Sequence, residues 1–170
     1  MVSLFFFVAK QEKGALWPTQ DYWELNKGTI KNTYPLPLVS ELLDKLKGAT
    51  IFSKLDLQNS YNNVQIKDGN QWKAAFKTNR GLFIPTVMFF GLSNSPATFQ
   101  AFMNNILSDF INKGWSVVYM DDILLFSKNP EDHREQTERL MRRIQKHNLY
   151  LKLEKCKFNV TEVVFLGILI

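Results

Sequence analysis

The sequence VVYMDDILLF at residues 117–126 places two adjacent acids, Asp121 and Asp122, between two apolar runs. The runs at residues 115–120 and 123–127 favour strands, so they predict a hairpin with both acids at its tip. Two carboxylates at the bend of a buried hairpin are electrostatically unfavourable without a counter-cation. A hard divalent ion such as Mg²⁺ relieves this repulsion through oxygen ligands. Taken alone, the hairpin fits a solvated turn of two Asp residues at least as well.

A third acid, Asp56, ends another apolar run at residues 50–57, which predicts a strand. On its own this is an ordinary Asp at the end of a strand. Catalysis by two metal ions, about 3.5–4 Å apart, requires several carboxylates that converge from separate segments. Asp56, Asp121 and Asp122 would supply such a set if the strands that carry them are neighbours.

The sequence FGLSNSPATFQ at residues 90–100 predicts a loop that leads into a helix. Gly91 allows close approach of the backbone, and Ser95 and Pro96 suit the N-cap and the first position of a helix. The free amide groups of that helix start could face a nucleotide or a template. The helix has an apolar stripe made of Phe99, Phe102, Met103, Ile106, Leu107 and Phe110.

The rest of the chain predicts a mixture of helices and strands, which indicates an α+β fold. The further predicted elements are a buried strand at residues 4–10, a helix at 38–46 ended by Gly48, a hairpin pair at 64–66 and 72–78, a helix from Asn129 to about His147, and short strands at 149–153 and 163–170. On the long helix we expect Leu140, Met141 and Ile144 to face inward. We expect His133 and His147 to be solvated.

The composition is that of one globular domain of 170 residues, with 45% hydrophobic and 22% charged residues. The net charge of +5 can favour a phosphate backbone, although the basic residues are spread along the chain. The single cysteine, Cys156, excludes a disulfide framework and a cysteine-based zinc site, and it fits a reducing, intracellular compartment. No apolar run is long enough to span a membrane, so no membrane partner is expected.

Taken together, the three acidic and loop segments resemble, in their order, the core motifs of reverse transcriptases. The likeness is greatest to the gypsy class of long-terminal-repeat retrotransposons, and it covers nearly the whole chain. Further matching segments are YPLPL at residues 34–38, FSKLDL at 52–57, WKAAFKT at 72–78, LYLK at 149–152 and FLG at 165–167.

The resemblance implies the fingers and palm of a reverse transcriptase, with an antiparallel palm sheet backed by helices and no thumb. By this likeness the fingers comprise approximately residues 1–31 and 64–94, and the palm approximately residues 32–63 and 95–170. The family's matching acids, here Asp56, Asp121 and Asp122, hold two Mg²⁺ ions, which Mn²⁺ could replace. The backbone carbonyl of Leu57 is expected to help.

The resemblance also implies two groups of residues that contact substrates. The residues expected to bind the incoming nucleotide are Lys10, Ser60, Tyr61, Phe90 and Gly91, with Tyr61 as the aromatic residue that disfavours a 2′-hydroxyl. The residues expected beside the primer or template are Tyr119, Met120, Ser95, Pro96, Phe165, Leu166 and Gly167.

Two tryptophans depart from the family pattern, which usually has Arg at the positions of Trp17 and Trp23. The first of those Arg residues normally contacts the nucleotide triphosphate, and Trp offers one neutral donor in its place. The resemblance places Lys10 near the same phosphates, so it is expected to compensate for part of this loss. The family also continues into a thumb and further domains, so a chain that stops at Ile170 is expected to have poor processivity.

The resemblance therefore implies an RNA-directed DNA polymerase core, whose partners are an RNA or DNA template with its primer and deoxynucleoside triphosphates. The alternative is a catalytically inactive retrotransposon remnant that at most binds nucleic acid. The Trp substitutions favour this alternative, and the intact acids oppose it. An accidental motif match in a basic α+β domain is the third interpretation. The implied location is intracellular, in a cytoplasmic retrotransposon particle or in the nucleus.

Overall fold

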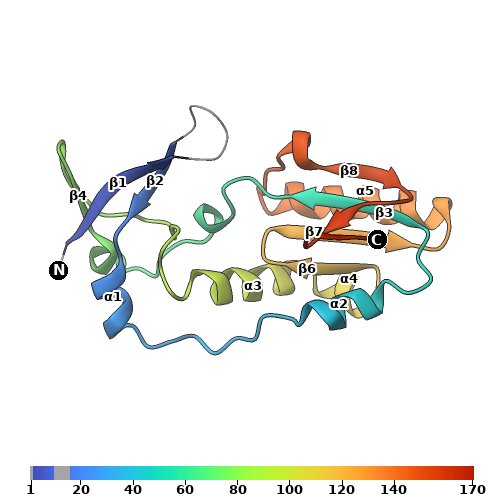
Figure 1. Cartoon of the computed structure of the whole chain (residues 1–170), viewed down its shortest axis with the longest axis horizontal. Helices are drawn as coiled ribbons and strands as arrows, with labels where there is room; N and C mark the ends of the chain where they lie inside the picture. Colours follow the sequence, from blue (N-terminus) through green and yellow to red (C-terminus); the bar gives the residue numbers. More distant parts are fainter. Residues whose placement is uncertain (1, 10–15) are drawn as a thin grey trace. The chain divides into compact units, whose positions relative to one another are not determined.

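A computed structural model describes residues 2–9 and 16–170 of the chain, which fold as two compact units. The first unit comprises Met1–Thr33 and Tyr61–Thr98, and the second comprises Tyr34–Ser60 and Phe99–Ile170. The ribbon in Figure 1 shows both units and labels many of their helices and strands. The α+β fold that the sequence predicts is confirmed.

The first unit contains a four-stranded sheet in the order β2-β1-β4-β5. Its strands are β1 (Ser3–Ala9), β2 (Leu16–Gln20), β4 (Phe76–Thr78) and β5 (Gly81–Phe83). Strand β1 pairs antiparallel with β2 and parallel with β4, and β4 and β5 form a hairpin. The same unit contains the short helix α1 (Trp23–Gly28) and a 3-10 helix over Gln71–Ala74.

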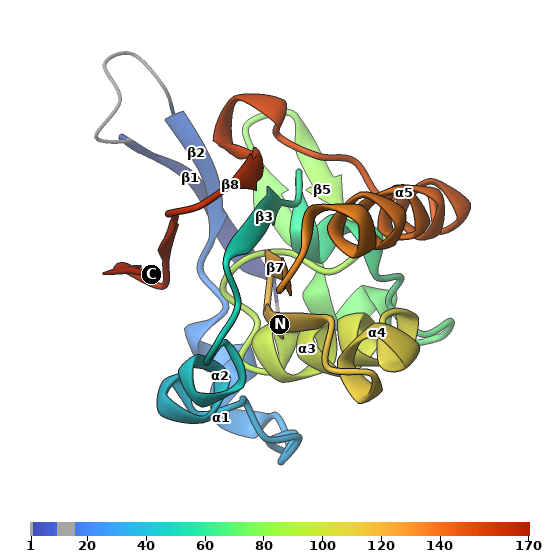
Figure 2. The ribbon, with the colours of Figure 1, turned by 90° about the vertical axis from the view of Figure 1, so that its right-hand side faces the viewer.

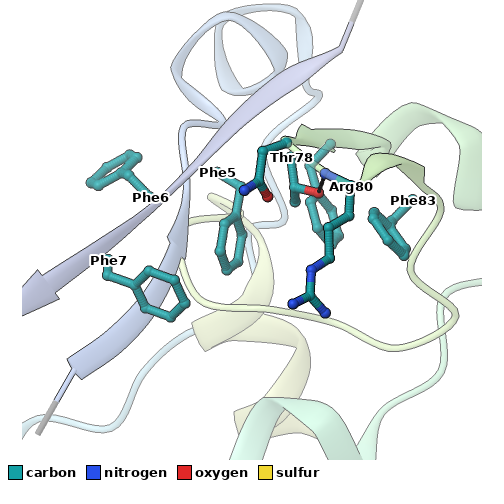
Figure 3. A pocket seen from close by; sticks show the side chains of 8 residues that line it. Phe5, Phe6, Phe7, Thr78, Arg80 and Phe83 are labelled. Carbon is teal, nitrogen blue, oxygen red and sulfur yellow. Dashed lines mark hydrogen bonds between the residues drawn. The ribbon is translucent and has the colours of Figure 1, made fainter.

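Strand β1 exists as predicted, but the prediction that it is buried is wrong. Leu4 is 66% exposed and Phe7 is 59% exposed. Phe5 and Phe76 stack with ring centroids 5.5 Å apart, and Phe76 and Phe83 stack at 5.8 Å. Phe5, Phe76 and Phe83 line a pocket of about 680 Å³ together with Arg80. Figure 3 shows Phe5, Phe83 and Arg80 at this pocket. The aromatic side chains therefore pack on one another along the sheet and not inside a closed core.

The hairpin pair predicted at residues 64–66 and 72–78 is wrong. Residues 71–74 form the 3-10 helix, and the hairpin is instead made by β4 and β5. Gln65 makes an isolated bridge to Val87. Phe76 pairs with Phe83 in the β4–β5 hairpin and with Ser3 of the parallel strand β1. The pairing with β1 joins residues far apart in the sequence, so local sequence patterns do not predict it.

The second unit contains an antiparallel sheet in the order β6-β7-β3-β8. Its strands are β3 (Ile51–Asp56), β6 (Ser116–Tyr119), β7 (Asp122–Ser127) and β8 (Lys157–Val160). The helices of this part of the chain are α2 (Val39–Lys45), α3 (Ser95–Ile106, which starts in the first unit), α4 (Ser108–Asn112) and α5 (Pro130–Lys146). Helix α5 packs on β3, β7 and β8.

The two faces of this sheet have different partners because side chains alternate along each strand. Phe52, Leu124 and Phe126 form one core cluster with α2 residues and with Phe165. Figure 2 shows α2 and the C-terminal segment on one side of β3 and β7, and α4 and α5 on the other. Asp56 and Asp122 are at even-numbered positions of their strands, so they share the face of Phe52 and Leu124.

Helix α5 starts as predicted, since Asn129 is its N-cap and accepts a hydrogen bond from the Asp132 backbone N–H. Leu140 and Ile144 face inward as predicted, whereas Met141 is exposed. The prediction that His133 is solvated is wrong, because its side chain is fully buried. Its polar neighbours, described below, explain how a histidine is accommodated there.

The helix that starts at Ser95 also forms, but it stops at Ile106, and Phe110 belongs to the separate helix α4. At the C-terminus, residues 149–153 form no strand: Leu151 makes an isolated bridge to Leu57, and Leu153 begins a 3-10 helix over Leu153–Lys155. The last residues form a hairpin of β9 (Val164–Phe165) and β10 (Ile168–Leu169). No helix among the described residues is long and apolar enough to cross a membrane.

Candidate active site

The three acids identified from the sequence lie at one end of the second unit's sheet. Strands β3 and β7 are neighbours, and Asp56 and Asp122 are directly opposite each other in their register. The Leu57 backbone N–H donates to the Asp121 carbonyl at 3.2 Å. The structure therefore brings together the ends of two strands that are 65 residues apart in the sequence, which was the condition for a shared carboxylate set.

The hairpin that carries Asp121 is tight. Tyr119 pairs with Asp122, so Met120 and Asp121 form its two-residue loop. Met120 has a positive φ of 51°, a conformation that costs energy for a residue with a side chain. The loop is thus held in a specific backbone geometry, and something outside the hairpin has to support it.

Gln100 of helix α3 provides this support, although the sequence did not mark it as a site residue. Its side-chain Nε2 donates to the Val118 carbonyl at 3.1 Å, and its Oε1 accepts from the Met120 N–H at 2.8 Å. The side chain is fully buried, so both hydrogen bonds are shielded from water. The only sequence signal was its position at the end of the FGLSNSPATFQ segment.

The electrostatics of the acids are those of a crowded anionic site. Burial raises the pKa of the Asp122 carboxyl above its ordinary value, and the charges of Asp121 and Asp56 add to this rise. The ammonium of Lys54 opposes it through a hydrogen bond and a charge interaction. A carboxylate that is disfavoured by burial and by like charges is stabilised when a cation joins it.

Each of two acids has a lysine partner. Lys152 Nζ lies 2.8 Å from Asp56 Oδ1, and Lys54 Nζ lies 3.1 Å from Asp122 Oδ1. Lys54 precedes Asp56 by two residues, so strand alternation alone could have placed it on the acids' face. Lys152 follows 96 residues after Asp56, and no local pattern pointed to it.

The donor set fits a hard divalent cation in its chemistry, because it combines three carboxylates with mutual repulsion. The geometry is not that of a ready metal site. Within residues 2–9 and 16–170, no three His, Cys, Asp or Glu side chains are grouped so that they could hold a metal ion. The Leu57 carbonyl, expected to help, accepts a hydrogen bond from Ser60 Oγ at 3.4 Å.

The residues predicted to bind the nucleotide are divided between the units. Tyr61, Phe90 and Gly91 belong to the first unit, whereas Ser60 belongs to the second and is buried. The rings of Tyr61 and Phe90 meet edge to face with centroids 4.7 Å apart. Lys10 lies outside the described residues.

Gly91 has a φ of 93°, which residues with a side chain rarely adopt. A Cβ at this position would lie 3.3 Å from the Gln20 carbonyl, so the backbone approach requires glycine. The Asn26 side chain fixes the loop, because its Nδ2 donates to the Gly91 carbonyl and its Oδ1 accepts from the Ser93 N–H.

Of the residues predicted beside primer or template, Tyr119 and Met120 lie at the hairpin tip next to the acids. Phe165 is fully buried in the core cluster, and Leu166 and Gly167 form the turn of the β9–β10 hairpin. Ser95 is buried and donates through Oγ to the Phe89 carbonyl, while Pro96 is half-buried. Phe165 and Ser95 thus have structural contacts of their own.

Comparison with known proteins gives the family. The sequence profile described as "Reverse transcriptase (RNA-dependent DNA polymerase)" matches residues 10–170. The chain belongs to the reverse transcriptase family. The fold prediction of fingers and palm agrees with this assignment.

Relatives of this reverse transcriptase domain include transposon proteins. The chain is 41% identical over 161 residues to the Transposon Tf2-3 polyprotein of Schizosaccharomyces pombe (strain 972 / ATCC 24843). The match covers 95% of this chain but only 12% of the polyprotein. The Transposon Tf2-7 polyprotein of the same organism is 40% identical over the same length.

Solved structures share the fold of the domain. The foamy viral protease-reverse transcriptase in complex with an RNA/DNA hybrid superimposes with a TM-score of 0.89 at 24% identity, covering 99% of this chain and 22% of that one. A foamy viral protease-reverse transcriptase in complex with double-stranded DNA gives 0.90 at 25% identity, covering 99% and 29%.

Proposed function

We propose that this reverse transcriptase domain is the catalytic core of an RNA-directed DNA polymerase of the gypsy class. The observation that carries the proposal is the convergence of Asp56, Asp121 and Asp122 at one end of the second unit's sheet. In this assignment the second unit corresponds to the palm and the first to the fingers, close to the boundaries expected from the sequence. The substrates are deoxynucleoside triphosphates and a primer on an RNA or DNA template.

The carboxylates of the three acids would hold two Mg²⁺ ions, which when bound promote attack of the primer 3′-hydroxyl and departure of pyrophosphate. The chain's own part is to position these carboxylates. Gln100 fixes the backbone on both sides of Tyr119, and the β3–β7 register fixes Asp56 opposite Asp122. Preorganised groups of this kind are what phosphoryl transfer mainly requires from a protein.

The first test is extension of a labelled primer on a short RNA template by the purified chain with Mg²⁺ or Mn²⁺. The matched control is the Asp121→Asn/Asp122→Asn double variant, which keeps the shape of both side chains and removes their charge. We expect extension by the parent chain and none by the variant. Equal extension by both would show that these acids do not carry the reaction.

The second candidate function is nucleic-acid binding without catalysis, which Trp17 and Trp23 favour because they replace the usual Arg residues. Binding of an RNA–DNA hybrid, measured by fluorescence anisotropy against salt concentration, separates the two. Salt-sensitive binding without metal-dependent extension would favour the binding function. Extension that depends on the acids would favour the polymerase.

A further inference from the structure

The contact between Lys152 and Asp56 was not predicted from the sequence, because the two residues are 96 positions apart. Lys152 Nζ lies 2.8 Å from Asp56 Oδ1, an oxygen that the proposed function gives to a divalent cation. We infer that Lys152 is a built-in counter-ion that competes with a divalent cation for Asp56. Metal binding must then displace the ammonium group from this carboxylate. The inference rests on the proposed function of the acids.

The backbone around Lys152 holds it beside Asp56 in a fixed position. The Lys152 N–H donates to the Asp56 carbonyl at 3.0 Å, and the Gln58 N–H donates to the Tyr150 carbonyl at 2.7 Å. These two hydrogen bonds flank the bridge between Leu57 and Leu151. The segment from Tyr150 to Lys152 therefore runs antiparallel to the end of β3, so the ammonium needs no loop movement to reach the acid.

Cys156 also hydrogen-bonds to the backbones of both Lys152 and Asp56. Its Sγ donates to the Lys152 carbonyl at 3.3 Å and accepts from the Asp56 N–H at 3.5 Å. The thiol is buried, and burial raises its pKa, so it remains a neutral partner. The backbones of Lys152 and Asp56 are thus connected directly and also through one sulfur atom.

The ion pair lies where a charge interaction is effective. The side chains of Lys152 and Asp56 are 30% and 18% exposed, so water screens them less than a pair on the open surface. Lys54 pairs with Asp122 in the same way, so two ammonium groups offset the negative charge of three carboxylates. This reduces the repulsion between the acids. In our inference, the two lysines occupy the carboxylates that a metal ion would use. This is why the described residues contain no group of three side chains arranged to hold a metal ion.

A substitution at Lys152 tests the role of a lysine counter-ion more directly than one at Lys54. The Lys54 ammonium also donates to the Val164 carbonyl at 3.3 Å, so its removal would disturb the β9–β10 hairpin as well as the acid. The side chain of Lys152 pairs with Asp56, so a change at Lys152 removes this ion pair. A matched control is Lys155, which is exposed, three residues farther along the same segment.

The experiment measures Mn²⁺ binding by electron paramagnetic resonance on the full chain and on Lys152→Gln, Lys152→Arg and Lys155→Gln. We expect Lys152→Gln to bind Mn²⁺ about tenfold more tightly, because the competing charge and its repulsion of the metal are both removed. Lys152→Arg keeps the charge and Lys155→Gln keeps the ion pair, so both should bind like the parent. Melting temperature gives a second readout, with a larger metal-induced rise for Lys152→Gln than for the parent.

Unchanged or weaker Mn²⁺ binding by Lys152→Gln would overturn the inference, as would the same gain in Lys155→Gln. If Lys152→Gln does not fold, Lys152→Met replaces it, and the same outcomes apply. An Asp56→Asn variant separates this inference from the proposed function. Loss of Mn²⁺ binding in Asp56→Asn with no gain in Lys152→Gln would refute only the role of Lys152. Binding that Asp56→Asn leaves intact would refute the metal site, and with it both proposals.

Discussion

At the tip of the β6–β7 hairpin, one buried amide side chain controls the backbone that carries the acids. Gln100 accepts a hydrogen bond from the Met120 N–H and donates one to the Val118 carbonyl. Met120 is in a strained conformation, which persists only while its surroundings impose it. The position of Asp121 therefore depends on a residue from another element that never has to touch a substrate.

Replacing Gln100 with methionine tests this dependence, since the side chain keeps its length and loses its hydrogen bonds. We expect the free energy of unfolding to fall by about 1–3 kcal/mol, because the hydrogen bonds from Gln100 to the Val118 carbonyl and the Met120 N–H are lost. We expect primer extension to fall more than hybrid binding does, as the change acts on the acids and not on a basic surface. Urea denaturation and single-turnover extension measure the two effects. Equal losses in binding and extension would contradict this role.

The two tryptophans at usual arginine positions give a second prediction at the scale of single residues. Trp23 is 68% exposed, with Lys27 Nζ 3.9 Å from its ring centroid, so Trp23→Arg should change stability by less than about 0.5 kcal/mol. The resemblance gives position 17 an Arg that contacts the nucleotide triphosphate, so we expect Trp17→Arg to lower the nucleotide KM roughly tenfold. Steady-state extension at varied nucleotide concentration measures this. A lack of gain from Trp17→Arg would count against the role that the resemblance gives to this position.

At the scale of elements, a chain of hydrogen bonds joins α5 to three parts of the sheet through His133. His133 Nε2 lies 2.8 Å from Ser53 Oγ, and Nδ1 lies 3.0 Å from Ser127 Oγ. Ser127 donates to Gln136 at 2.6 Å, so its oxygen is left to accept from Nδ1–H. Ser53 then donates to Nε2 and accepts from the Asn159 N–H of β8. Every member is satisfied when the imidazole is neutral.

This network predicts a loss of stability in acid. Burial lowers the pKa of His133 below its ordinary value of 6.5, so the unfolded chain takes up a proton first as the pH falls. The stabilisation is complete above pH 6.5 and decreases as the pH falls toward the folded pKa. Each unit of difference between the two pKa values corresponds to about 1.4 kcal/mol.

Urea unfolding of the parent and of His133→Asn at pH 8 and at pH 5 measures this contribution. We expect the variant to be less stable at pH 8 and to lose less stability on acidification, because its side chain does not titrate. Other acids and bases contribute equally to both proteins, so the difference between them isolates His133. The same acid sensitivity in both proteins would refute the prediction.

At the scale of the whole molecule, the distribution of apolar surface differs between the units. The second unit encloses its core between the sheet and its helices. The first unit's sheet has an aromatic face made of Phe5, Phe7, Phe76 and Phe83, of which Phe7 and Phe83 are exposed and the other two half-buried. Exposed apolar patches on soluble proteins commonly mark contacts with other molecules or a tendency to associate. The chain spans about 12% of the length of the curated relatives named above.

We expect the isolated chain to self-associate through the aromatic face as its concentration rises. The Phe7→Ser/Phe83→Ser variant should shift the sedimentation profile toward the monomer, because it removes two exposed rings from the face. Ile30→Ser is the matched control, since Ile30 is a highly exposed apolar residue that does not line the pocket. A parent chain that remains monomeric, or an equal shift in the control, would contradict this expectation.

The elements that could be predicted without a structure are those whose signals are local. Apolar runs that favour strands predicted β3, β6 and β7, and the Asn129–Pro130 pair predicted the start of α5. The positions of the three acids at strand ends followed from the same patterns. Such signals depend on residues a few positions apart, which is why they can be read without a structure.

Contacts between distant residues depend on tertiary packing and could not be predicted in this way. Lys152 is 96 residues from Asp56 and Gln100 is 20 from Met120, and each pair depends on how strands and helices pack. His133 looked like a surface residue because a polar side chain normally avoids burial, until Ser53 and Ser127 supplied its hydrogen bonds. Strand β1 looked buried because it is apolar, but burial requires a covering layer. The sequence sets what each segment prefers, and the packing of segments decides which preferences are met.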